Sequence, residues 1–179
     1  MEEKKYTDIK KSAANYRDIF TFIYAGIILL SPEIVRFMAN ESYWEGLYLV
    51  PWIFMSYYFM FMYTMEVKVE FYYKKTGLIS IGTFLSAVIN IILTIIFVPI
   101  YGYPVAAITT AISFFLLFIF HYLLTSRVIK HKLFGFRFHM VSLTYVLLIT
   151  LIFFVVQDTF WIRVMCLFVL IIIALIKIK

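Results

Sequence analysis

Three polar side chains recur at helical spacing inside an otherwise apolar stretch: Ser86, Asn90 and Thr94. Because they are four residues apart, they share one face of an α-helix. Such a stripe either forms hydrogen bonds to a neighbouring helix or lines a polar cavity, and helix packing is the commoner use. If the stripe lines a cavity, these three residues are the candidates for binding a substrate.

The other reactive side chains form no catalytic or metal-binding pattern. His121, His131 and His139 lie in or near one basic segment, and no carboxylate stands at helical spacing from them. The single cysteine, Cys166, excludes an intrachain disulfide and a cysteine-based metal cluster. No nucleophile and base, phosphate-binding glycine loop or metal-ligand spacing occurs. We therefore predict no catalytic residue, no metal, no cofactor and no enzymatic activity; a proton-relay role is least implausible for His121.

Six apolar stretches, separated by short polar segments, must position these residues. They cover residues 19–38, 43–65, 77–98, 105–124, 140–156 and 160–176. Each is close to the roughly 20 residues that an α-helix needs to cross about 30 Å of hydrocarbon. Since 64% of the 179 residues are hydrophobic, the sequence predicts an all-α membrane bundle of six transmembrane helices.

Lysine and arginine are concentrated in alternate segments between these stretches. Fourteen of the 16 lie before residue 18, between residues 66 and 76, between residues 126 and 138, or after residue 176. Because cytoplasmic segments hold the excess of cations, we expect a multi-pass protein of the bacterial inner membrane with both termini in the cytoplasm. The net charge of +6 then reflects topology and attraction to anionic lipid, and it does not indicate nucleic acid. Arg163, near the outer end of the last stretch, is expected to extend its guanidinium to water.

Residues 1–17 form a polar segment before the six-span bundle of residues 18–179. Apolar side chains recur from Tyr6 to Phe20 at steps of three and four, which predicts an amphipathic helix along the inner membrane surface. This segment serves either as a linker to another bundle or as a topological signal.

Several motifs, in order along residues 20–130, resemble those of one transporter family. They are residues 31–34 (SPEI) followed by Tyr43, residues 72–76 (YYKKT), residues 90–93 (NIIL), residues 98–102 (VPIYG) and residues 106–110 (AAITT). They are similar to motifs of the polysaccharide and lipid-linked oligosaccharide flippases of the multidrug/oligosaccharidyl-lipid/polysaccharide exporter superfamily. Val105 and Thr109 stand where that family often has glycine and alanine, so packing of the fourth span is expected to differ.

The resemblance implies one half of a two-bundle transporter. Six spans correspond to the C-terminal bundle, so the chain would be a fragment or half of a flippase that exports undecaprenyl-linked oligosaccharide units for surface polysaccharides such as lipopolysaccharide. Its partners would be the lipid-linked oligosaccharide, membrane lipid, and an N-terminal half bundle or a second copy. Ser86, Asn90 and Thr94 would form a polar wall of the cavity, and the cationic recognition of the substrate would lie in the other half.

Two other functions remain open. The chain could be a half-size transporter that dimerises, or a non-transporting membrane scaffold of a polysaccharide assembly complex. Replacing Asn90 by leucine separates a cavity wall, which should lose export, from a scaffold, which should tolerate the change.

Overall fold

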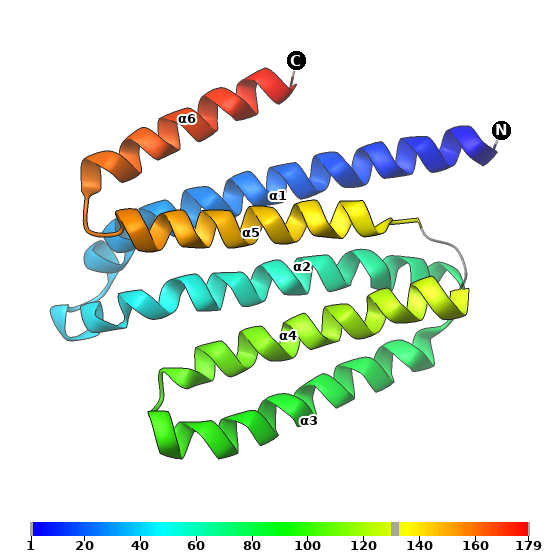
Figure 1. Cartoon of the computed structure of the whole chain (residues 1–179), viewed down its shortest axis with the longest axis horizontal. Coiled ribbons are helices and arrows are strands. Elements are labelled where there is room, and N and C mark those ends of the chain that lie inside the picture. Colours follow the sequence, from blue (N-terminus) through cyan, green and yellow to red (C-terminus); the bar gives the residue numbers. More distant parts are fainter. Residues whose placement is uncertain (1, 130–132, 179) are drawn as a thin grey trace. The chain divides into compact units, whose positions relative to one another are not determined.

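The computed structural model describes residues 2–129 and 133–178, and every regular element in these ranges is helical. In chain order the elements are α1 (Glu2–Met38), the 3₁₀-helix η1 (Glu41–Leu49), α2 (Val50–Tyr72), α3 (Thr76–Tyr101), α4 (Val105–Leu124), the π-helical turn η2 (Thr125–Ile129), α5 (Phe136–Val156) and α6 (Phe160–Ile178) (Figure 1). The expected all-α fold with six long helices is confirmed.

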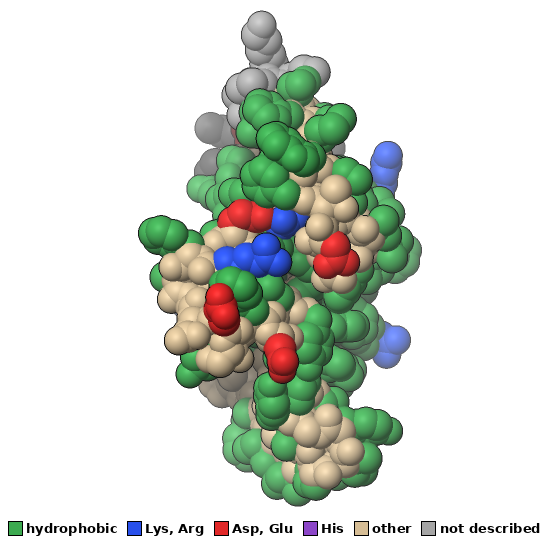
Figure 2. Space-filling view, turned by 90° about the vertical axis from the view of Figure 1, so that its left-hand side faces the viewer, with side chains coloured by type: hydrophobic (Ala, Val, Ile, Leu, Met, Phe, Trp, Pro, Cys, Tyr) green, Lys and Arg blue, Asp and Glu red, His purple; other side chains and the backbone are tan. Residues whose placement is uncertain are grey.

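Four helical segments are long and apolar enough to cross a membrane. They are Thr7–Met38, Thr76–Tyr101, Val105–Arg127 and Phe136–Val156, whereas the described apolar part of α6, Phe160–Ile173, is shorter. Large apolar side chains on α3 are open to the surroundings, with Phe84 69% and Ile95 68% exposed. Figure 2, which views the molecule from the left-hand side of Figure 1, shows hydrophobic side chains over much of this face, with several charged side chains near its middle. These features indicate a membrane protein.

The stretch expected to cross at residues 43–65 departs most from the prediction. Residues 41–49 form η1, and α2 begins at Val50, so Pro51 lies in the first turn of a helix and not inside a span. A first turn tolerates proline because its N–H groups have no partner within the helix. The helix then continues past residue 65 to Tyr72 and so includes Glu66 and Glu70. Tyrosines and these charges make α2 less apolar than the four segments above.

The first helix contains both the expected segment of residues 1–17 and the expected first span. It has 37 residues, which at 1.5 Å per residue is about 55 Å, longer than the roughly 30 Å of a hydrocarbon core. No glycine or proline precedes Gly26, so the sequence provides no break between the two parts. Pro32 lies inside α1, and Ser31 Oγ donates to the Ile28 carbonyl at 2.7 Å, the carbonyl that Pro32 cannot pair with.

The chain divides into two compact units, one comprising Met1–Pro51 with Met140–Lys179 and the other Trp52–His139. In the first unit, Arg163 on α6 donates to the two carboxylate oxygens of Glu33 on α1 at 2.5 and 3.0 Å. Arg163 is 3% exposed, so the expectation that its guanidinium reaches water is wrong. A carboxylate on the neighbouring helix neutralises the arginine inside the protein.

In the second unit, α4 runs beside α3 (Figure 1), and both contribute to the site described below. The turn between them depends on Gly102, whose φ is +80° and whose N–H donates to the Val98 carbonyl at 2.8 Å. Glycine adopts this conformation without the steric cost that a Cβ would add. Tyr58 and Met62 on α2 and Phe118 on α4 are fully buried and form the apolar core of this unit.

Candidate functional site: two buried histidine–carboxylate pairs

Four ionisable side chains are buried together in the second unit. Glu66 and Glu70 lie one turn apart on α2 and are 2% and 0% exposed. His121 is in the last turn of α4, and His139 is in the first turn of α5; their exposures are 0% and 1%. Spacing of four residues places both carboxylates on one face of α2, so one helix end supplies the acids and two others supply the bases.

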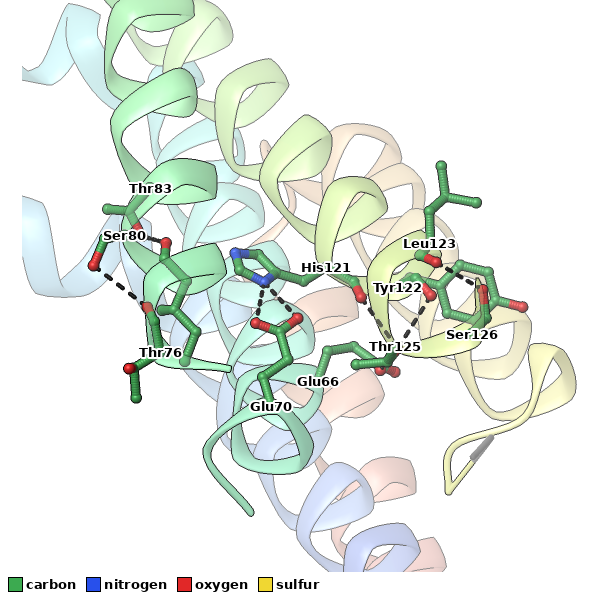
Figure 3. A network of polar contacts seen from close by, with 11 residues as sticks. Glu66, Glu70, Thr76, Ser80, Thr83, His121, Tyr122, Leu123, Thr125 and Ser126 are labelled. Carbon is green, nitrogen blue, oxygen red and sulfur yellow. Dashed lines mark hydrogen bonds and ion pairs between the residues drawn. The ribbon is translucent and has the colours of Figure 1, made fainter. Parts of the chain in front are cut away.

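Each histidine is paired with one glutamate. Nδ1 of His121 lies 2.8 and 2.9 Å from the two carboxylate oxygens of Glu70 (Figure 3). Nε2 of His139 lies 2.6 Å from Oε1 of Glu66. The second oxygen of Glu66 accepts a short hydrogen bond from Oγ1 of Thr125, the residue at which η2 begins. These contacts tie α2 to the end of α4 and to the start of α5.

Aromatic rings surround both histidines. The His139 ring lies 5.0 Å from the rings of Phe118 and Tyr122 and 5.3 Å from that of Phe138. The His121 ring lies 5.2 Å from that of Tyr63 and 5.3 Å from that of Phe120. These aromatic rings form much of the apolar enclosure of the two imidazoles.

The far nitrogen of each ring has no hydrogen-bond partner. Nε2 of His121 and Nδ1 of His139 are both buried and unpaired among the described residues. On α3, a Cβ added to Gly82 would lie 2.7 Å from Nε2 of His121. The absence of a side chain at residue 82 is therefore what allows α3 to approach this nitrogen.

The protonation of this cluster controls its charge. Among the described residues, no lysine or arginine pairs with Glu66 or Glu70, and the histidines are their only basic partners. With both carboxylates ionised and both histidines neutral, the cluster would carry two buried negative charges, which is costly in a low dielectric. One added proton per pair removes that charge. The arrangement is suited to holding protons.

Metal binding has less support than proton binding. Within residues 2–129 and 133–178, no group of three or more His, Cys, Asp or Glu side chains is arranged to hold a metal ion. His131, one of the three histidines considered above, lies outside the described residues.

The three residues predicted as a substrate-binding stripe all contact α4. Ser86 Oγ donates to the Ser113 carbonyl at 3.0 Å, and Asn90 Nδ2 donates to Thr110 Oγ1 at 3.4 Å. The Thr94 and Thr109 hydroxyls lie 3.2 Å apart. We call this line of contacts the α3–α4 seam. Each stripe residue thus bonds to the neighbouring helix, as the packing alternative expects, while a role in substrate binding stays a prediction.

Sequence reasoning missed the glutamates because the second span was expected to end at residue 65. A helix five residues longer would have shown Glu66 and Glu70 at spacing i, i+4, and His121 and Thr125 have the same spacing. Two such pairs, one on α2 and one that begins near the end of α4, were the available signal. In the structure, Glu70 pairs with His121, 51 positions later in the chain, and Glu66 pairs with Thr125, 59 positions later. The periodicity of a sequence does not reveal pairs so far apart.

Fold and site together define an all-helical membrane protein with a buried histidine–carboxylate cluster. Comparisons with protein-family models, curated proteins and solved structures found no match to this chain. The resemblance to the flippase family therefore rests on the sequence motifs.

Proposed function

We propose that the chain acts in transport across the bacterial inner membrane, as one helix bundle of a flippase for undecaprenyl-linked oligosaccharides. The observation that carries a transport function is the buried cluster of Glu66, Glu70, His121 and His139. Ionisable side chains inside membrane helices are costly, and they mark ion pathways and proton relays. The choice of lipid-linked oligosaccharide as substrate is supported by the ordered motifs of residues 31–110.

The proposed mechanism is alternating access, in which one bundle moves against another around a site near the middle of the membrane. A sugar headgroup crossing the hydrocarbon needs polar side chains along its route. The α3–α4 seam supplies hydroxyl and amide groups over the stretch from Ser86 to Thr94. Both termini are proposed to be cytoplasmic, because the cations concentrate in alternate segments.

Deleting the gene tests the proposal directly. The expected result is loss of surface polysaccharide, accumulation of lipid-linked oligosaccharide on the cytoplasmic side, and restoration of both by the intact gene. A tag placed after Lys179 in the chromosomal gene, followed by a blot of the membranes, gives the mass of the native polypeptide. Unchanged polysaccharide in the deletion strain would count against a flippase.

A matched pair of variants separates substrate contact from helix packing. Asn90→Leu and Thr110→Val both remove the hydrogen bond between these residues, but only the first removes the amide that a substrate would use. Loss of export in Asn90→Leu alone supports a cavity wall. Equal loss in both assigns the pair to packing, and full export in both would contradict a substrate role of Asn90.

A further inference from the structure

We propose that Glu70 and His121 bind one exchangeable proton, which enters and leaves at Nε2 of His121, while Glu66 and His139 form a fixed brace. Use of this proton as the coupling ion deepens the proposed function and rests on it. Binding of the proton does not depend on the proposed function, because it is inferred from the buried pair alone.

The hydrogen-bond geometry identifies Nε2 as the atom that changes. In the unloaded pair, Nδ1–H of a neutral His121 donates to the Glu70 carboxylate, Nε2 is bare, and the pair has one negative charge. Adding one proton gives either imidazolium with carboxylate or imidazole with carboxylic acid. In both forms one hydrogen stays between Nδ1 and the carboxyl group, and Nε2 carries the other. The loaded pair is neutral.

Neither state of the pair is fully satisfied in this conformation. The unloaded pair leaves a buried negative charge, and the loaded pair leaves an N–H of His121 without an acceptor, because Nε2 has no partner. Each omission is unfavourable in a low dielectric. A site balanced in this way releases and rebinds a proton more readily than one that satisfies a single state.

The surroundings of Nε2 lead toward the seam. Gly82 on α3 lies against this nitrogen, and Ser86, Asn90 and Thr94 follow on the same face at four-residue intervals. From Gly82 to Thr94 the helix rises about 18 Å at 1.5 Å per residue, more than half of a hydrocarbon core of about 30 Å. A small displacement of α3 would open Nε2 to the hydroxyl and amide groups of the α3–α4 seam.

The second pair also leaves one ring nitrogen unpaired, Nδ1 of His139, but its carboxylate is held from two elements, η2 and α5. Each carboxylate oxygen of Glu66 has its own hydrogen-bond partner, His139 Nε2 or Thr125 Oγ1. The His139 ring is enclosed by three aromatic rings. Tyr63 is in ring contact with His121, and Tyr122 is in ring contact with His139; both are titratable.

Nitrogen NMR of the histidine rings tests proton binding without any assumption about transport. The full chain, labelled with ¹⁵N-histidine in lipid nanodiscs, is titrated between about pH 5 and pH 8, where histidine commonly changes charge. The expected result is that Nε2 of His121 gains its hydrogen as the pH falls, while the signals of His139 stay fixed. Signals are assigned from single histidine-to-asparagine variants, or by elimination where one variant does not fold. A His121 ring that does not change, or a His139 ring that changes with it, would overturn the proposal.

Transport is tested in inverted inner-membrane vesicles from cells that carry each variant on the chromosome. Entry of a fluorescent undecaprenyl-pyrophosphate sugar should be about fivefold or more faster with a pH gradient than without it, a typical size for coupling between two sites. Glu70→Gln should lose this dependence, and Glu45→Gln, at an exposed carboxylate on η1 outside the cluster, should keep it. Entry by wild type that ignores the gradient would refute proton use and leave the flippase standing. A titrating His121 with no entry at all would refute the flippase and leave the proton site standing.

Discussion

Replacing Gly82 by alanine tests how closely α3 approaches the cluster. A Cβ at this position would lie 2.7 Å from Nε2 of His121 and 2.7 Å from Cδ1 and Cε1 of Phe120. Non-bonded carbon atoms are normally about 3.5–4.0 Å apart, so the rings or α3 must move by about 1 Å. Both obstacles are ring atoms of buried or half-buried side chains and not the ends of flexible chains.

Gly26→Ala on α1 is the matched control, because a Cβ at Gly26 would meet nothing within 4 Å. Alanine in place of glycine inside a helix favours folding by about 0.5–1 kcal/mol. Overpacking costs about 1–3 kcal/mol. We therefore expect Gly26→Ala to raise the free energy of unfolding by about 0.5–1 kcal/mol. Gly82→Ala should give a result between no change and a loss of about 2.5 kcal/mol.

The full chain in mixed micelles is unfolded with increasing amounts of a denaturing detergent. Circular dichroism monitors the loss of helix at each step. The difference between the two variants isolates the overpacking term, about 1–3 kcal/mol. If both alanines raise the stability equally, α3 does not approach His121 as described, and Gly82 has no part in access to Nε2.

Three other predictions follow from the ion pairs and the topology. Glu66→Ala should lower the free energy of unfolding by about 3–5 kcal/mol, because it leaves the buried partners of a hydrogen-bonded pair unsatisfied. Glu33→Ala should destabilise more than Arg163→Met, since the side chain of Glu33 is 35% exposed and can be hydrated alone, whereas that of Arg163 is 4% exposed and cannot; the reverse order in the same assay would contradict this. Cysteine at Tyr103 should react with an impermeant maleimide added to intact spheroplasts, and cysteine at Lys75 only after permeabilisation, if the cations mark the cytoplasmic side.

The helices could be predicted from the apolar stretches, because a long apolar segment is stabilised as a helix in a bilayer or a protein core whichever segments lie next to it. The stretch expected at residues 105–124 coincides with α4, Val105–Leu124. Its beginning is fixed locally, by Gly102 and the two residues that precede α4. The expected span at residues 43–65 failed because hydrophobicity continues through η1, while the backbone changes its helix type near Pro51.

The candidate site was less accessible to sequence reasoning. Ser86, Asn90 and Thr94 were found because their partners in the pattern lie on the same helix. Glu70 and His121 were not, because their pairing depends on which helix end lies beside which, and that is decided by packing of the whole unit. Arg163 was misplaced for the same reason: its partner Glu33 is 130 residues away in the chain.

The energies of the seam and the cluster bear on which helix can move. Interhelical hydrogen bonds between polar side chains in membranes average about 0.6 kcal/mol, so the three seam contacts together give about 2 kcal/mol. Among the described residues, only 6% of the most apolar window of α3 is buried. Removing one partner of a buried ion pair changes stability by about 3–5 kcal/mol, more than the whole seam. If proton binding at His121 is coupled to a movement of α3, the coupling acts at Gly82, where α3 approaches Nε2 of His121.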